Sequence, residues 1–296
     1  MFVLIPTDME DKTASLIKQA RGCYHQNLLD SILTISNSGI PSNADSSSKL
    51  SIRIAKGITD MLESRTDHKY VAQSSGKAFE EINMQFLQET IPMLREFRPA
   101  KWTIQRLGNS NKNGIANFEQ YAHLEELNAL ASANKVLATA MGRDYMVCPD
   151  VVMYRDPLED EELNKNTHLV DPETACRTIL RKANGGKQIL HASVSSKWTI
   201  RSDRSQNSRT EALNLIRNRK GHLPHIVVIT AEPLPSRIAS IALGTGDIDC
   251  VYHSFLYELV EAVRKANLED AAEMLNIMIE GKRLKDISDL PFDLMI

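Results

Sequence analysis

Long hydrophobic runs are missing from this 296-residue sequence, and no apolar stretch approaches the roughly 20 residues that a membrane-spanning helix requires. The first six residues carry no basic leader and end at a proline, so we expect no secretory signal. Only four cysteines occur, far apart and without a CxxC pair, so we expect neither a sulfur-ligated metal nor a disulfide framework. These absences favour a protein of the reducing, cytoplasmic compartment that has no membrane partner.

The composition that remains is typical of a globular chain. Hydrophobic residues make up 42% and charged residues 25%, values that exclude collagen-like and wholly disordered proteins. The formal net charge is −3, yet seven cations and only two acids lie between Lys197 and Lys220. That stretch therefore carries +5 and the rest of the chain −8. A basic block on an acidic body predicts a localised site for an anion.

Hydrophobic periodicity predicts an α/β fold, in which helices flank a small mixed sheet. Pro92 should interrupt the helix over residues 78–97, and Gly142 should cap the helix over 118–141. We expect helices at 12–36, 52–62, 78–97, 118–141, 208–220, 255–266 and 268–280, and strands at 151–154, 188–200 and 226–230.

A set of carboxylates and one lysine could carry chemistry. Ser195 and Lys197 project from the same face of the strand over 188–200, because side chains alternate along a strand. Asp150 precedes another strand, Glu211 lies within a helix and Glu80 lies near the start of a third element. Carboxylate oxygens are the ligands that Mg²⁺ prefers, and a lysine beside them can stabilise a phosphate in its transition state. This set predicts metal-assisted hydrolysis of a phosphodiester.

The segment after this strand is equipped to recognise bases. Arg201, Asp203 and Arg204 fall within four residues. Arginine pairs with guanine through O6 and N7, and a carboxylate accepts a hydrogen bond from cytosine N4. The segment therefore predicts contacts to G and C in the major groove, although the same residues could form a surface ion-pair cluster.

Residues 191–204 read HASVSSKWTIRSDR and resemble the core of the NgoMIV-type restriction endonucleases. These enzymes belong to the PD-(D/E)xK superfamily, in the branch that cuts sites with a CCGG centre. The resemblance continues through RNRKG at 217–221, TAEP at 230–233 and GKRLKDI at 281–287, and covers most of the chain from about residue 40. It implies a restriction-endonuclease core in one domain over 1–296, with a helical part over about 1–140 and the catalytic core over about 145–296.

The resemblance also implies catalytic roles. Asp150 matches the aspartate of the family's PD motif, a metal ligand, and Lys197 matches its active-site lysine. Ser195 stands where most of the superfamily has an acid, and Glu211 matches the helical glutamate that replaces that acid in this branch. The implied cofactor is Mg²⁺, with two ions per active site. Further implied active-site groups are Glu80, the backbone carbonyl of Ser196 as a metal ligand, and Glu211 as a further candidate ligand.

Base recognition is implied in the same way. Arg201, Asp203 and Arg204 match the residues that read the inner CCGG of double-stranded DNA. Two further positions match readers of the outer base pair, and a loop serine matches another contact, which gives the palindrome GCCGGC. The implied assembly is a dimer of dimers, and a cognate DNA methyltransferase is expected as a functional rather than physical partner. The outer-pair and loop positions are Arg237, Gln73, and Ser46 or Ser47.

These observations predict a type II restriction endonuclease that leaves 5′-phosphates. One alternative is a related endonuclease with another CCGG-centred site, since readers of the outer base pair diverge most easily. Another is a sequence-specific DNA-binding protein without catalysis, which the presence of Asp150, Lys197 and Glu211 disfavours. A phosphate loop at residues 244–246 is disfavoured because the GTG sequence is short and no Lys-Ser/Thr follows it.

Overall fold

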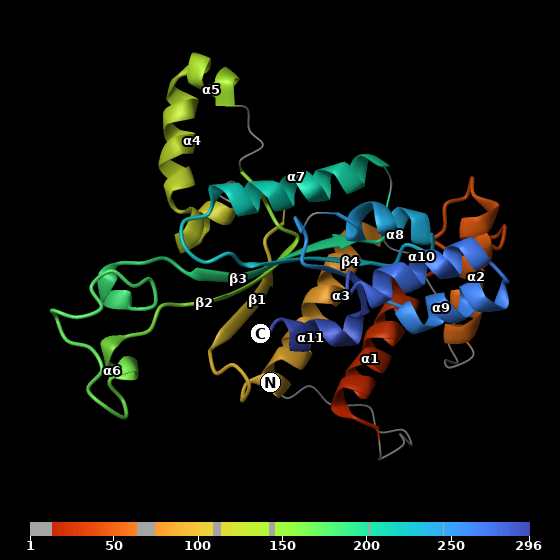
Figure 1. Cartoon of the computed structure of the whole chain (residues 1–296), viewed down its shortest axis with the longest axis horizontal. Helices are drawn as coiled ribbons and strands as arrows, with labels where there is room; N and C mark the ends of the chain where they lie inside the picture. The colour runs from red at the N-terminus through yellow and green to blue at the C-terminus, as the bar shows by residue number, and fades with distance from the viewer. Residues whose placement is uncertain (1–13, 64–74, 109–113, 142–145, 201, 245) are drawn as a thin grey trace.

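A six-stranded mixed sheet with helices on both sides forms the centre of the protein (Figure 1), and this confirms the predicted α/β class. The computed structural model of the chain describes residues 14–63, 75–108, 114–141, 146–200, 202–244 and 246–296. Gln73, Gly142 and Arg201 lie outside the described residues. Among the helices that are described, none has the length and apolar character needed to cross a membrane.

The strands follow one another across the sheet in chain order. The first three pair antiparallel and the last three continue in parallel, so β3 joins the two halves. The parallel half has buried apolar strands because helices cover both of its faces. The strands are β1 (Trp102–Arg106), β2 (Val151–Arg155), β3 (Ile189–Lys197), β4 (His225–Thr230), β5 (Cys250–His253) and β6 (Leu284–Asp286).

The helices confirm most of the predicted ones, with shifted ends. In Figure 1 α7 lies above the sheet, while α1 and α3 lie below it, and α3 packs against β1, β2 and β3. One hydrophobic cluster runs from Ala20 to Leu294 and joins both layers. The helices are α1 (Leu16–Ser31), α2 (Lys49–Glu63), α3 (Ser75–Thr90), α4 (His123–Ala133), α5 (Lys135–Met141), α6 (Asp160–Leu163), α7 (Ser202–Asn218), α8 (Pro235–Ala242), α9 (Leu256–Lys265), α10 (Glu269–Glu280) and α11 (Leu290–Asp293).

The single helix predicted over 118–141 is wrong. A 3₁₀ turn over Glu119–Tyr121 precedes α4, and Asn134 then separates α4 from α5 with an extended backbone. The Asn134 side chain accepts a hydrogen bond from the backbone N–H of Val136, which starts the new helix. Asparagine competes with the helical backbone in this way, so it breaks a continuous apolar pattern.

The predicted interruption at Pro92 is confirmed, because α3 ends at Thr90 and a 3₁₀ turn over Ile91–Leu94 follows. Proline lacks the N–H that the next helical hydrogen bond needs. Strands β1, β5 and β6 have three to five residues each and were not predicted. Runs this short show too few alternations to be recognised.

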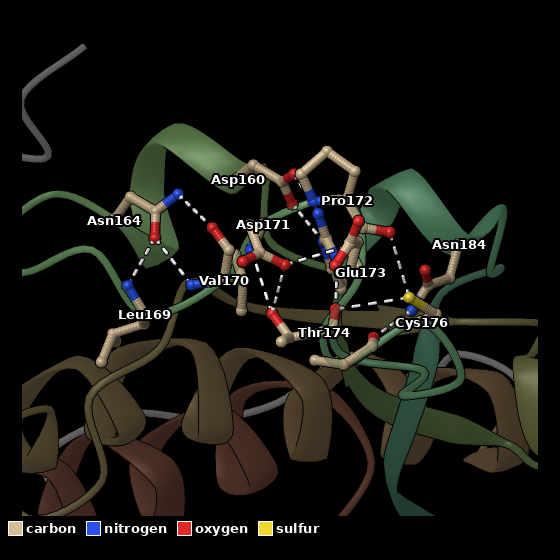
Figure 2. Close-up of polar contacts among 12 residues, drawn as sticks. Asp160, Asn164, Leu169, Val170, Asp171, Pro172, Glu173, Thr174, Cys176 and Asn184 are labelled. Atoms are coloured by element: carbon tan, nitrogen blue, oxygen red, sulfur yellow. Dashed lines mark hydrogen bonds and ion pairs between the residues drawn. The ribbon is translucent and has the colours of Figure 1, made fainter.

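The connection between β2 and β3, residues 156–188, extends away from the sheet at the left of Figure 1. Polar contacts hold it together, as Figure 2 shows. Arg181 forms an ion pair of 2.6 Å with Asp160, and the side-chain Oδ1 of Asn164 accepts hydrogen bonds from the backbone N–H groups of Leu169 and Val170. The segment thus satisfies its polar groups locally.

Candidate active site

The predicted catalytic lysine and aspartate meet where β2 begins and β3 ends. Val151 pairs with Val194, so Asp150, one residue before β2, lies beside the last residues of antiparallel β3. The Lys197 ammonium lies 3.2 Å from Asp150 Oδ2, and the backbone N–H of Ser196 donates to the same oxygen at 2.7 Å. Both side chains are about one-fifth exposed, at 18% and 22%. The pair is therefore fixed at the edge of the sheet and open to a substrate.

Two carboxylates act on this pair from either side of the sheet. Burial raises the pKa of Glu80 on α3, and the charge of Asp150 raises it further against Arg106 and Lys197. Burial also raises the pKa of Glu211 on α7, which Lys197 lowers and Asp150 raises. The structure therefore brings Asp150, Lys197, Glu80 and Glu211 together, although they come from four parts of the chain.

The pKa of the neighbouring Cys148 thiol shows that these acids lie close together. Burial raises the pKa of its thiol, and the charges of Asp150, Glu211 and Glu80 raise it in turn. Three acids that act on one thiol create a site of concentrated negative charge. Such a site favours a cation.

Two residues of this site were missed by sequence reasoning. Arg106 on β1 lies 3.1 Å from Glu80 and 3.2 Å from Glu81, and so holds the start of α3. Asn83, fully buried on α3, donates to the Ser196 hydroxyl at 3.0 Å and accepts from the Tyr24 hydroxyl at 2.7 Å. No sequence pattern distinguishes either residue, because only the packing of α3 on β1 and β3 brings them to the site.

The donor groups present fit a hard divalent cation. Among the described residues, no group of three or more His, Cys, Asp or Glu side chains could by itself enclose a metal. Mg²⁺ does not need such a group, because it retains several waters and binds through one or two carboxylates and the phosphate. The Ser195 hydroxyl is buried and has no hydrogen-bond partner within the described residues, so it is an unused oxygen two residues before Lys197 on β3. Carboxylates, a hydroxyl and the Ser196 carbonyl form an all-oxygen donor set.

Three of the predicted DNA-reading residues, Arg237, Ser46 and Ser47, lie on neighbouring segments. Arg237 on α8 forms an ion pair with Asp45, in the loop that contains the exposed Ser46 and Ser47. Hydrogen bonds from the Ser47 side chain and backbone lower the pKa of Asp45, and Arg237 lowers it further. Asp45 was not among the predicted residues. The loop and α8 thus meet through a charged contact.

The inner-site segment lies at the start of α7, where Asp203 and Arg204 occupy the first turn. Arg201 precedes it, outside the described residues, and so does Gln73 before α3. The helix places this basic segment directly after the strand that carries Lys197.

Comparison with known proteins shows the family. The model of the NgoMIV restriction enzyme family matches residues 24–296. This chain belongs to the NgoMIV restriction enzyme family. The type II restriction enzyme NgoMIV of Neisseria gonorrhoeae is 52% identical over 283 residues, which are 95% of this chain and 99% of that protein. Membership of the NgoMIV family confirms the predicted enzyme class, a type II site-specific deoxyribonuclease.

A solved structure, described as a complex of restriction endonuclease PspGI with substrate DNA, is a more distant match. It covers 94% of this chain and 90% of its own, at 14% identity and a TM-score of 0.25. A TM-score this low supports no conclusion about the fold, so the NgoMIV family assignment depends on the sequence matches.

Proposed function

We propose that this protein is a Mg²⁺-dependent type II restriction endonuclease that hydrolyses double-stranded DNA at the palindrome GCCGGC and leaves 5′-phosphates. The observation that carries the proposal is the Asp150–Lys197 pair at the sheet edge, with the charges of Glu80 and Glu211 directed at it. Family membership supports DNA as the substrate.

In this proposal each side chain has a separate task. Asp150 and the Ser196 carbonyl bind the metal, and Glu211 is a further candidate ligand. Lys197 holds the attacking water and stabilises the negative charge that develops on the phosphate. When bound, Mg²⁺, for which we propose two ions per site, acts as a Lewis acid and lowers the pKa of its water. The catalytic residues are Asp150, Lys197, Glu211, Glu80 and Ser195.

The orientation of Asp150 supports its role. Ser196 and Lys197 both contact Oδ2, and in the described part of the chain no hydrogen bond occupies Oδ1. One oxygen therefore fixes the carboxylate to β3, and the other is available to a cation. The Ser195 hydroxyl, for which the described residues offer no hydrogen-bond partner, would orient a water or the lysine.

We assign base recognition to two groups. Arg201, Asp203 and Arg204 read the inner CCGG, where arginine pairs with guanine and aspartate with cytosine. The second group reads the outer base pair from the loop, α8 and the segment before α3. It consists of Arg237, Gln73, Ser46 and Ser47.

We further propose one endonuclease domain over 1–296 that assembles as a dimer of dimers. A palindrome is read by a twofold-symmetric protein, one half-site per subunit. The single hydrophobic cluster and the entry of β1 into the sheet support one domain. Sedimentation of the tetramer would give about four times the 33.2 kDa chain mass. A cognate methyltransferase would act on the same site without binding this protein.

The decisive experiment incubates the protein with plasmid DNA and Mg²⁺ and sequences the ends. Cleavage at GCCGGC with 5′-phosphates supports the proposal. Cleavage at another CCGG-centred sequence would change the proposed outer base pair of the site and leave the proposed catalytic mechanism unaffected. Specific binding without cleavage would favour a non-catalytic DNA-binding protein.

A further inference from the structure

A buried carboxylate lies between the segments assigned to base recognition. Glu232 follows β4 and is 0% exposed. Its Oε2 accepts the backbone N–H of Ile200 at 2.8 Å, and its Oε1 accepts the backbone N–H of Leu234 at 3.1 Å. Each carboxylate oxygen therefore holds a different part of the chain.

Both of these parts lead directly into a base-reading segment. Ile200 immediately precedes Arg201, at the start of the segment for the inner CCGG. Leu234 is the N-cap of α8, whose first turn carries Arg237. The Arg237 guanidinium also lies 3.9 Å from Glu232 Oε2. A single side chain thus connects the inner and outer readers.

The third segment attaches at the same corner. Asn43 is fully buried and donates to the carbonyl of Ala231 at 2.9 Å. It anchors the loop whose Asp45 pairs with Arg237. The loop, Ile200 and the start of α8 therefore meet at residues 231–234.

A histidine fixes the backbone of this corner. The backbone N–H of Phe255 donates to Nδ1 of His253 at 3.0 Å, so Nδ1 is the unprotonated nitrogen. Nε2 then carries the proton and donates to the carbonyl of Glu232 at 3.0 Å. Burial lowers the pKa of His253 to about 4, so this donor keeps one orientation at neutral pH. Glu232 is consequently held at both its backbone and its side chain.

Only a carboxylate of this length satisfies both segments. Two N–H donors need two acceptor oxygens, and glutamine offers one oxygen and one N–H₂. The amide group would face a backbone N–H, and one segment would lose its partner. Burial raises the pKa of Glu232, whereas the two hydrogen bonds and Arg237 lower it. Because burying a charged carboxylate costs free energy, stability alone does not explain why an acid stands here.

We propose that Glu232 is a positioning residue that fixes the inner and outer base-reading segments in one register, and so couples recognition of CCGG to recognition of the flanking base pair. The inference rests on the proposed function, because it assigns no base contact of its own. It adds that discrimination at both positions depends on a group that touches no DNA.

The test compares Glu232→Gln with the native protein on three duplexes: GCCGGC, one with a changed outer pair and one with a changed inner pair. We expect the ratio of kcat/KM for GCCGGC to that for the outer-pair duplex to fall by about tenfold, the scale of one mismatched base pair. The ratio for the inner-pair duplex should fall as well. Glu258→Gln is the matched control, since Glu258 is also a buried carboxylate, 3% exposed, and its side chain pairs with Arg21 on α1.

The control separates specificity from stability. Glu258→Gln should unfold at a lower temperature and keep both ratios, whereas Glu232→Gln should lose them at temperatures where it is fully folded. If Glu232→Gln does not fold, Asn43→Ala tests the same corner and should lose discrimination at the outer pair but keep it at the inner pair.

The outcomes that overturn the inference differ from those that overturn the function. Unchanged ratios in a folded Glu232→Gln protein, or in Asn43→Ala if that is the variant measured, exclude the positioning role. If Glu258→Gln lowered the kcat/KM ratios equally, the effect would come from stability, and the positioning role of Glu232 would be excluded as well. If the native protein itself prefers no CCGG-centred duplex, the proposed function fails instead.

Discussion

Two groups of buried or half-buried charges show how differently one chain can treat its carboxylates. In the first, Arg21 on α1 makes bidentate contacts with Glu258 at 2.7 and 3.2 Å and with Asp286 at 2.8 and 2.9 Å. Burial would raise the pKa of Glu258, but Arg21 outweighs it and lowers the value to about 2. Here one guanidinium hydrogen-bonds two acids, so each carboxylate has a cationic partner.

At the catalytic edge the balance is reversed. Lys197 has one ion pair within the described residues, with Asp150, while the pKa values of Glu80 and Glu211 are raised by burial and by Asp150. The negative charge that remains destabilises the folded protein but suits a divalent cation. The difference teaches that the acids of the Arg21 cluster have their partner within the chain, whereas the acids of the catalytic edge suit the bound cation that we propose.

The sharpest test of this contrast removes one member of the catalytic pair. Asp150→Ala or Lys197→Ala should reduce the single-turnover cleavage rate by at least about 10³-fold, because each loses several kcal/mol of transition-state stabilisation. Specific DNA binding, measured by gel shift, should persist, since we assign neither residue to a base contact. Ser195→Ala should reduce the rate less. Near-normal cleavage by either of the first two variants would disprove the assignment.

Removing a carboxylate from the Arg21 cluster should change the stability of the protein instead. Glu258→Gln should lower the free energy of unfolding by about 3 kcal/mol, because it removes one partner of a buried ion pair. Since the pKa of Glu258 is lowered from 4.5 to about 2, its contribution is full above pH 4.5 and is lost as the pH falls through 2. Denaturant unfolding at several pH values should show the difference between the variant and the native protein shrink over that range. A constant difference would contradict this origin.

The basic segment next to the catalytic edge offers a smaller effect on binding. Arg201→Ala and Arg204→Ala should weaken specific binding by about 1–3 kcal/mol per lost bidentate contact in each subunit. The exposed Arg217 and Lys220 are matched controls, whose loss should weaken specific and non-specific binding alike and flatten the salt dependence. Gel shifts at two salt concentrations separate the groups. Full discrimination by the Arg201 and Arg204 variants would exclude base reading.

The smallest expected effect is a gain in stability. Glu211→Gln should raise the free energy of unfolding at neutral pH by about 0.5–1 kcal/mol, because it removes a carboxylate that burial and Asp150 disfavour. A raised pKa means that the native protein loses stability as the pH rises from 4.5 through the pKa of Glu211. The gain in stability should therefore vanish below about pH 4.5. The same Glu211→Gln substitution should reduce the cleavage rate. A variant less stable than the native protein at neutral pH would contradict the idea that burial and Asp150 disfavour the charged Glu211 carboxylate.

Local patterns explain which expectations were met. The alternation over 188–200 predicted β3, and the apolar spacing predicted α1, α3, α7, α9 and α10, because these signals repeat several times. Asn134 divided a predicted helix since one side-chain hydrogen bond overrides an apolar pattern. The short strands β1, β5 and β6 depend on their neighbours for hydrogen bonds, so their own sequences carry little signal.

The sequence alone determined the types of residue available for chemistry and the family, because motifs and the identities of Asp150, Lys197, Glu211 and Glu80 are written in the chain. It also placed Ser195 and Lys197 on one strand face, which follows from alternation. Tertiary structure decided which groups hold those residues: Asn83 at Ser196, Arg106 at Glu80, and Glu232 between Ile200 and Leu234. These partners lie 26 to 113 residues apart in three of the four contacts, and only the packing of α3 and the order of the sheet bring them within hydrogen-bond distance.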